Sequence, residues 1–175
     1  MALMGPYYPV KRIEEQDADL TRLRGHAKQA IGQVIELSGR VLDRRGNPFG
    51  GAVIELWQAN AAGRYAHAND PGTSPLDPDF QGFAALRVGP DGHYRITTIK
   101  PPPYPARTLR PSHIHFDVRG RNARLVTQMF FPGEEEIKRN DRTFQQMGSA
   151  ASAATARLVS GHSNRYAWDI VLDDI

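Results

Sequence analysis

Segments in which apolar and polar residues alternate recur along this chain, and they restrict it to a fold made of strands. In residues 33–41, Ile35, Leu37 and Val41 alternate with polar residues, which gives an extended segment one apolar face. Similar segments follow at 52–58, 92–98, 113–118, 125–131 and 166–172. Short strands separated by turn-forming residues, without regularly alternating helices, predict an all-β fold: an antiparallel β-sandwich.

Loops and one helical insertion interrupt this pattern. Residues 63–83 and 100–110 are long and rich in Pro, Gly and Asn, and long loops within a compact domain usually carry function. The small, Ala-rich residues of 148–158 predict a short helical insertion before the last strand. Residues 1–32 lack a regular period, so we expect an N-terminal arm there and a single β-sandwich catalytic domain over 33–175.

The composition excludes several classes of function. Lys and Arg number 22 against 19 Asp and Glu, and no basic run interleaved with aromatic residues predicts nucleic-acid binding. The absence of cysteine excludes disulfides, Cys-ligated zinc and thiol nucleophiles. No segment resembles a signal peptide or is apolar for long enough to cross a bilayer, so we expect a cytoplasmic protein that does not bind membranes.

His113 and His115 stand two residues apart in a predicted strand. Side chains alternate across a strand, so both imidazoles should point the same way and supply half of a metal site. Taken alone, such a pair more often belongs to a partly exposed polar strand face than to a metal site. Asp117 shares that face and would complete a two-His, one-carboxylate Fe(II) or zinc site. Three same-face residues on one strand span too far for one ion, so we expect Asp117 to be a surface or supporting residue.

Tyrosine is the other available oxygen donor, and the long loops carry Tyr65 and Tyr104. A phenol normally stays protonated near neutral pH, but a bound trivalent cation favours its deprotonation. Two phenolates with two imidazoles would suit Fe(III) better than Fe(II). Prolines on both sides of Tyr104 stiffen its loop, as expected for a residue that must be positioned. The alternative for each tyrosine is a packing role with a hydrogen-bonded hydroxyl.

A series of motifs in one order resembles the intradiol ring-cleaving dioxygenase family, and within it the protocatechuate 3,4-dioxygenase group. The resemblance extends over nearly the whole chain. The motifs occupy residues 55–60, 63–65, 75–78, 99–101, 103–105, 110–116 and 127–128. The resemblance implies a non-haem Fe(III) cofactor with four ligands of the type found in the group's β chains: Tyr65, Tyr104, His113 and His115.

The same resemblance implies the remaining roles. Tyr104 would leave the metal and accept a substrate proton, and Arg110 would stabilise negative charge on the substrate ring. Gln128 would bind the substrate or orient the arginine. Tyr7 resembles a residue of the group's α chains that borders the substrate pocket. Ala106 departs from the β-chain pattern, in which a tryptophan stands at this position, and this difference alters the expected pocket.

The activity implied is cleavage of a catechol by O2 between its two hydroxylated carbons, giving a cis,cis-muconate derivative. Protocatechuate or a related substituted catechol is the expected substrate. We expect a homo-oligomer in which Tyr7 lines its own or a neighbour's pocket, or else an assembly with a paired α-like chain. Two alternatives stay open: a transthyretin-like β-sandwich binding module, suggested by residues 39–54, and a His/carboxylate Fe(II) or zinc enzyme.

Overall fold

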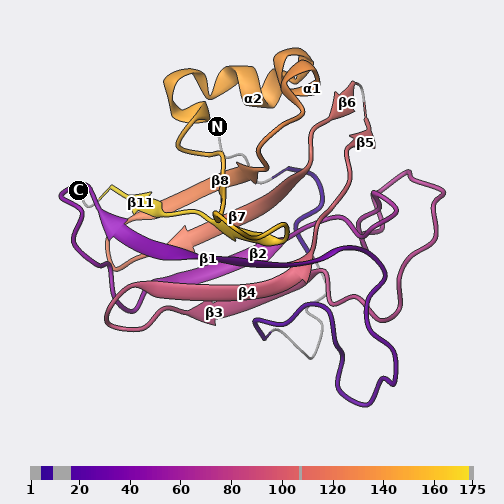
Figure 1. The fold of residues 1–175 in the computed structure, drawn as a ribbon, viewed down its shortest axis with the longest axis horizontal. Helices are drawn as coiled ribbons and strands as arrows, with labels where there is room; N and C mark the ends of the chain where they lie inside the picture. The colour runs from indigo at the N-terminus through magenta and orange to yellow at the C-terminus, as the bar shows by residue number, and fades with distance from the viewer. Residues whose placement is uncertain (1–4, 10–16, 107, 174–175) are drawn as a thin grey trace.

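Two packed β-sheets form the body of the protein, and helices lie at one end (Figure 1). The computed structural model describes residues 5–9, 17–106 and 108–173. Within these residues the first sheet contains β1 (Val34–Asp43), β4 (His93–Ile99), β9 (Arg157–Leu158), β10 (Arg165–Ala167) and β11 (Ile170–Leu172). The second contains β3 (Phe83–Arg87), β2 (Val53–Trp57), β7 (His113–Arg119) and β8 (Arg124–Phe130), in that order. A separate hairpin pairs β5 (Tyr104–Pro105) with β6 (Leu109–Arg110).

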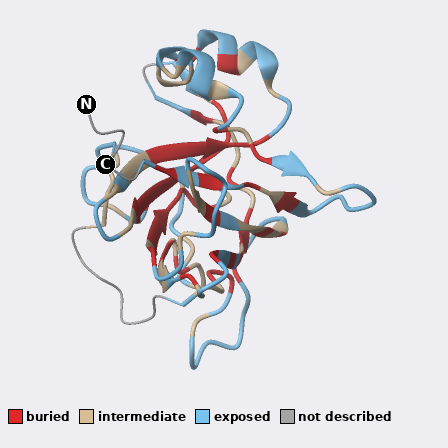
Figure 2. Cartoon of the chain, turned by 90° about the vertical axis from the view of Figure 1, so that its left-hand side faces the viewer, coloured by how far each residue is buried: buried red, intermediate tan, exposed pale blue. Residues whose placement is uncertain are grey.

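The predicted β-sandwich is confirmed, and its core follows from the strand alternation. Leu37 of β1 and Ile96 of β4 face the second sheet, whose Leu56 and Phe116 belong to the same buried cluster. The central strands are the most buried part of the molecule (Figure 2). Because neighbouring side chains of a strand point to opposite faces, the residues between these core positions project from the outer face of the second sheet. His115 of β7 is one of them.

The first sheet is mixed, whereas the sequence predicted antiparallel pairing. β1 pairs with β4 antiparallel, but it pairs with both β10 and β11 parallel. The segment predicted as one strand over 166–172 is broken at Trp168 and Asp169, where the Trp168 carbonyl accepts from the Tyr94 hydroxyl and the backbone N–H of Arg40 donates to the Asp169 side chain. Most of the chain lies between β1 and β10 in the sequence, and such a separation allows the chain to return along β1 in the parallel direction.

The helical insertion begins earlier than predicted. Two helices, α1 (Glu135–Asn140) and α2 (Arg142–Gln146), precede a 3-10 turn at Gly148–Ala151, and part of the expected 148–158 helix is strand β9. Acidic residues in the first turn of α1 and a capping aspartate before α2 stabilise these helices, whereas Gly148 adopts a positive φ of 54° that interrupts them. Within the described residues, no helix has the length and apolar character needed to cross a membrane.

The part of the N-terminal arm around Leu20 lies along β4 of the first sheet. Leu20 donates its backbone N–H to the carbonyl of Thr97 on β4, and its side chain is fully buried. No helix forms between residues 17 and 30. Residues 1–4 and 10–16 of the predicted arm lie outside the described residues. The remaining arm residues, 5–9, pass close to the site described below.

Candidate active site

The outer face of the second sheet carries both histidines of the His-x-His motif. His115 on β7 is paired in register with Trp57 at the end of β2. The two rings stack at 5.0 Å between centroids and 8° between planes. His113 lies two residues before His115, and its ring centroid is 5.0 Å from that of His115. The rigid strand therefore presents two imidazoles together, and Trp57 fixes the plane of one of them.

Tyr65 reaches the histidines from the loop between β2 and β3. The side-chain oxygen of Asn60 accepts hydrogen bonds from the backbone N–H groups of Ala62 and Arg64, at 2.9 and 3.0 Å. The carboxylate of Asp70 accepts from the backbone N–H of Tyr65 at 2.7 Å. Asn and Asp side chains that bond nearby backbone groups stabilise turns. The long loop is therefore ordered on both sides of Tyr65.

Tyr104 comes from the β5–β6 hairpin. It is paired in register with Arg110, so both predicted site residues are held by the same two short strands. The loop of Tyr65 passes so near that a Cβ on Gly63 would lie 2.9 Å from the Tyr104 Cβ, and Gly63 adopts a φ of 75°. Only glycine tolerates both the close approach and this backbone conformation without strain. Gly63 thus brings the two tyrosine loops together.

Four buried side chains meet at one point. The His115 Nε2 lies 3.1 Å from the Tyr65 hydroxyl, and the His113 Nε2 lies 3.4 Å from the hydroxyls of both Tyr65 and Tyr104. All four residues are less than 9% exposed. The structure therefore gathers the four predicted metal-binding side chains from one strand and two loops.

The protonation of these groups follows from burial. Burial, together with the nearby His115 and Arg110, holds the pKa of His113 well below its ordinary value, so its ring is neutral near pH 7. Its Nδ1 lies 2.7 Å from the carbonyl oxygen of Pro111. A neutral ring can make this bond only by donating from Nδ1, which leaves Nε2 with a free electron pair. Burial likewise raises the pKa of Tyr65 and of Tyr104, so both phenols are protonated without a cation.

Arg110 lies beside the four residues and has two partners. Its Nη2 donates to the side-chain oxygen of Gln128 at 2.7 Å, and its Nε lies 2.7 Å from a carboxylate oxygen of Asp141. Gln128 is opposite His115 in the β7–β8 register. This hydrogen bond is compatible with one of the two roles expected for Gln128, which is to orient the arginine. The sequence analysis missed Asp141. The only signal in the sequence that could have drawn attention to it is its position as a capping residue before a helix.

Glu134 is a second residue that sequence reasoning missed. Its two carboxylate oxygens accept from the backbone N–H and the hydroxyl of Ser112, each at 2.8 Å. Ser112 stands between Arg110 and His113, so the helical insertion holds this motif at two points, Ser112 through Glu134 and Arg110 through Asp141. Among the described residues other than glycine, only Glu134 has a positive φ, at 60°. A strained residue with two side-chain bonds is typical of a site that needs exact support.

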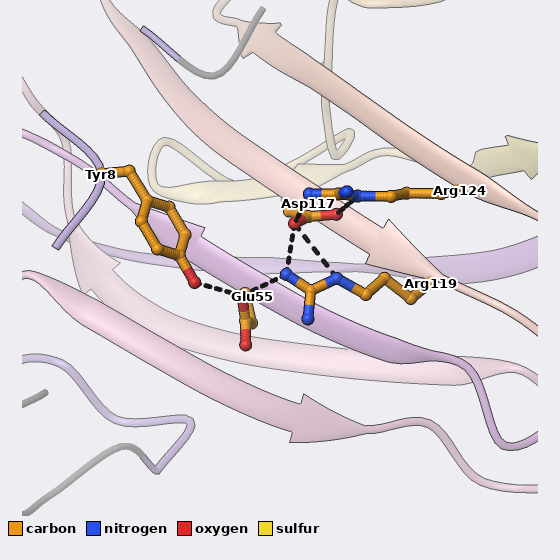
Figure 3. Close-up of polar contacts among 5 residues, drawn as sticks. All are labelled: Tyr8, Glu55, Asp117, Arg119 and Arg124. Carbon is orange, nitrogen blue, oxygen red and sulfur yellow. Dashed lines mark hydrogen bonds and ion pairs between the residues drawn. The ribbon is translucent and has the colours of Figure 1, made fainter. Parts of the chain in front are cut away.

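Asp117 does not join the four residues. It was expected at the surface or in a supporting position, and the surface reading is wrong, because Asp117 is fully buried. Its carboxylate accepts hydrogen bonds from Arg119 and Arg124 at distances of 2.6 to 3.2 Å (Figure 3). Burial raises the pKa of Asp117, but the bonds from Arg124 and Arg119 outweigh it and leave the pKa below its ordinary value. Both oxygens of the Asp117 carboxylate therefore accept hydrogen bonds from arginines.

Tyr7 borders the site from the N-terminal arm. Its ring centroid lies 4.7 Å from that of Tyr65 and 5.9 Å from that of His67. Burial and the nearby Asp70 raise the pKa of the Tyr7 phenol. The aromatic cluster of Trp57, Tyr65 and Tyr104 is therefore extended by a residue far away in the sequence.

Known proteins resemble this chain over almost its full length. The family model described as Dioxygenase (Dioxygenase_C) matches residues 3–174. The protocatechuate 3,4-dioxygenase beta chain of Burkholderia cepacia is 40% identical, over 95% of this chain and 76% of its own length. A hydroxyquinol 1,2-dioxygenase of Nocardioides simplex is 32% identical over 82% of this chain; the match spans only 55% of that protein.

Solved structures show the same fold. The dioxygenase domain of a carbohydrate-binding fusion protein from Streptomyces sp. SirexAA-E superposes with a TM-score of 0.75 at 25% identity, covering 99% of this chain and 96% of that one. Hydroxyquinol 1,2-dioxygenase from Pseudomonas putida DLL-E4 gives 0.72 at 22% identity, covering 99% and 65%. With the family match and the relatives above, these findings establish that the chain belongs to the intradiol ring-cleaving dioxygenase family and is an enzyme of that class.

Proposed function

We propose that Tyr65, Tyr104, His113 and His115 bind a non-haem Fe(III) ion. The observation that carries this proposal is the convergence of their donor atoms, with contacts of 3.1 to 3.4 Å. Two ligands about 2.1 Å from one ion and separated by ordinary coordination angles lie about 3.0 to 3.4 Å apart. The spacing between these donors therefore fits a shared cation.

The chemistry of the donors supports a ferric rather than a ferrous or zinc site. Two phenols with raised pKa values need a strongly polarising cation to become phenolates. A His/carboxylate site has less support, because Asp117 is held by two arginines. The described residues contain no cluster of three or more His, Cys, Asp or Glu side chains suited to a metal. A binding module without catalysis would have no physical need for four buried polar groups in contact.

The chain's residues fit the cleavage of a catechol by O2 between its two hydroxylated carbons. Bound Fe(III) would supply Lewis acidity and an electron relay that make the catecholate reactive towards O2. Tyr104 lies on a short hairpin that is not part of either sheet, so we propose that it moves away and accepts a substrate proton. Tyr65, ordered by Asn60 and Asp70, would stay in place.

Arg110 is the proposed stabiliser of negative charge on the substrate ring. A guanidinium keeps its charge at any working pH, and Gln128 and Asp141 fix its orientation before substrate arrives. The side chain is mostly buried, at 17% exposure, where the interaction with an anion is stronger than in water. The product would be a cis,cis-muconate derivative.

We propose protocatechuate or a related substituted catechol as the substrate. The 40% identity to a protocatechuate 3,4-dioxygenase beta chain supports this choice over a catechol without substituents. Tyr7 lies against Tyr65 within the same chain, which supports a pocket completed by this chain's own arm. We therefore propose a homo-oligomer; the other possibility is an assembly with an α-like chain.

The visible absorption spectrum of the iron-loaded protein tests the ligand set. We expect a tyrosinate-to-Fe(III) charge-transfer band that shifts when protocatechuate is added without oxygen. The double variant Tyr65→Phe/Tyr104→Phe should lose the band, while Tyr166→Phe, which removes a hydroxyl from β10, should keep it. A wild-type protein that stays colourless after reconstitution with iron would overturn the assignment. A double variant that retains the band would do the same.

A further inference from the structure

Tyr8 is anchored to the second sheet by its hydroxyl. The hydroxyl donates to a carboxylate oxygen of Glu55 at 2.7 Å, and Glu55 lies on β2 with only 5% exposure (Figure 3). Burial and Glu55 raise the pKa of Tyr8, so the phenol is a hydrogen-bond donor at any working pH. A hydrogen bond to a buried charged acceptor is among the stronger ones in proteins. The arm is thus tied to a strand distant in sequence.

Arg119 contacts the carboxylate that receives this bond, and Arg124 contacts the neighbouring carboxylate of Asp117. Glu55 and Asp117 are opposite each other on β2 and β7, where two carboxylates alone would repel. Arg119 lies between them: its Nη2 is 3.0 Å from Glu55 and 2.6 Å from Asp117. Arg124 neutralises the second charge of the pair. Glu55 is therefore fixed in place beside the Arg119 guanidinium, which makes it a firm attachment point for Tyr8.

The ring of Tyr8 connects this attachment to the site. It meets Trp57 edge-on, with centroids 5.0 Å apart, and Trp57 in turn stacks on His115. Three residues earlier, Gly5 adopts a φ of 66°, and a Cβ there would lie 3.0 Å from the His115 Cε1. The segment 5–9 therefore passes close to the imidazole ring at Gly5, leaving no room for a side chain there, and is linked to it through Tyr8 and Trp57. Tyr7 points instead towards Tyr65.

We infer that Tyr8 is a positioning residue whose hydrogen bond to Glu55 latches residues 5–9 across the site and thereby holds Tyr7 at the border of the substrate pocket. This inference rests on the proposed function only for the identity of the substrate. Loss of the bond releases the arm without removing any of the four converging side chains. Substrate binding then weakens, because the arm must be ordered again each time substrate binds.

Tyr8→Phe in the full-length, iron-loaded protein tests the latch, with Tyr166→Phe as the matched loss of one hydroxyl elsewhere. We expect KM for protocatechuate to rise about tenfold in Tyr8→Phe while kcat changes little. Loss of a hydrogen bond to a charged group typically changes an equilibrium constant by about this factor. Deuterium exchange of the peptide that covers residues 5–9 should become faster, measured without substrate. Tyr8→Ala should increase both effects because the ring contact with Trp57 is lost too.

The outcomes separate the latch from the proposed function. A wild-type charge-transfer band that persists in Tyr8→Phe, together with faster exchange and a raised KM, supports the latch. Unchanged exchange and unchanged KM in Tyr8→Phe overturn it, even if the variant melts at a lower temperature, because the bond is then only structural. Absence of the band in the wild-type protein refutes the ferric site instead, while the exchange measurement still decides whether Tyr8 holds the arm.

Discussion

Arg110 and Asp141 form an ion pair in which the carboxylate is almost completely buried, at 1% side-chain exposure, with 2.7 Å between Nε and Oδ2. The same aspartate caps α2, because its other oxygen accepts from the backbone N–H of Phe144 at 2.7 Å. One side chain thus joins the helical insertion to the arginine of the site. The insertion is part of the machinery that orients Arg110.

Replacing Asp141 with Asn separates the two roles of this side chain. Asn caps helices about as well as Asp, so α2 should remain folded, while Arg110 loses its charged partner. We expect kcat/KM to fall about 10- to 100-fold, since a small displacement of a catalytic group is costly. Steady-state kinetics with circular dichroism measures both effects. Glu136→Gln, a similar change at an exposed position on α1, is the control. Wild-type kinetics in Asp141→Asn would show that Gln128 alone orients the arginine.

Glu134 combines two hydrogen bonds to Ser112 with a strained backbone, and two substitutions separate these contributions. Glu134→Gly loses the bonds but relieves the positive φ of 60°, whereas Glu134→Ala loses the bonds and keeps the strain. We expect both variants to be less stable than the wild type, Ala by about 1 kcal/mol more than Gly. Urea unfolding monitored by fluorescence gives these differences. An Ala variant as stable as the wild type would mean that the bonds contribute nothing, because Ala keeps the strain and lacks only the bonds.

The candidate site was predictable where short-range rules apply. The period of a strand places His113 and His115 on one face, whatever the rest of the chain does. The positions of Tyr65 and Tyr104 came from motif resemblance, because no local rule says where two long loops will meet. The contact between Gly63 and Tyr104 that joins these loops becomes visible only in three dimensions.

The parts that escaped prediction depend on long-range packing. Asp141 and Glu134 reach the site only because the helices fold back over the end of the sandwich, and their own sequence reads as an ordinary acidic helix start. The parallel pairing of β10 and β11 with β1 was missed for a related reason. Alternation predicts that a segment is a strand, but it does not give the direction of its neighbour.

Asp43 links the stability of the turn that follows β1 to pH. Hydrogen bonds from the side chain and backbone of Asn47 hold its pKa below the ordinary value. A carboxylate with a lowered folded-state pKa stabilises the protein above its unfolded pKa, and the effect is lost as pH falls through the folded value. We expect Asp43→Asn to be less stable than the wild type at pH 7 and the gap to close below about pH 4. Urea midpoints across this range measure it; a gap independent of pH would contradict the account.

Gly39 is the position where the first sheet has least room. A Cβ there would lie 1.8 Å from the carbonyl oxygen of Trp168, which also accepts the Tyr94 hydroxyl at 2.6 Å. A backbone atom cannot move aside as a flexible side chain can, so Gly39→Ala must separate β1 from the segment between β10 and β11. We expect a loss of at least about 3 kcal/mol in the free energy of unfolding. Gly161→Ala, at an open position with a φ of 78°, should cost only about 1 kcal/mol. A loss in Gly39→Ala no larger than that in Gly161→Ala would contradict this account, because β1 would then separate from the Trp168 carbonyl at little cost.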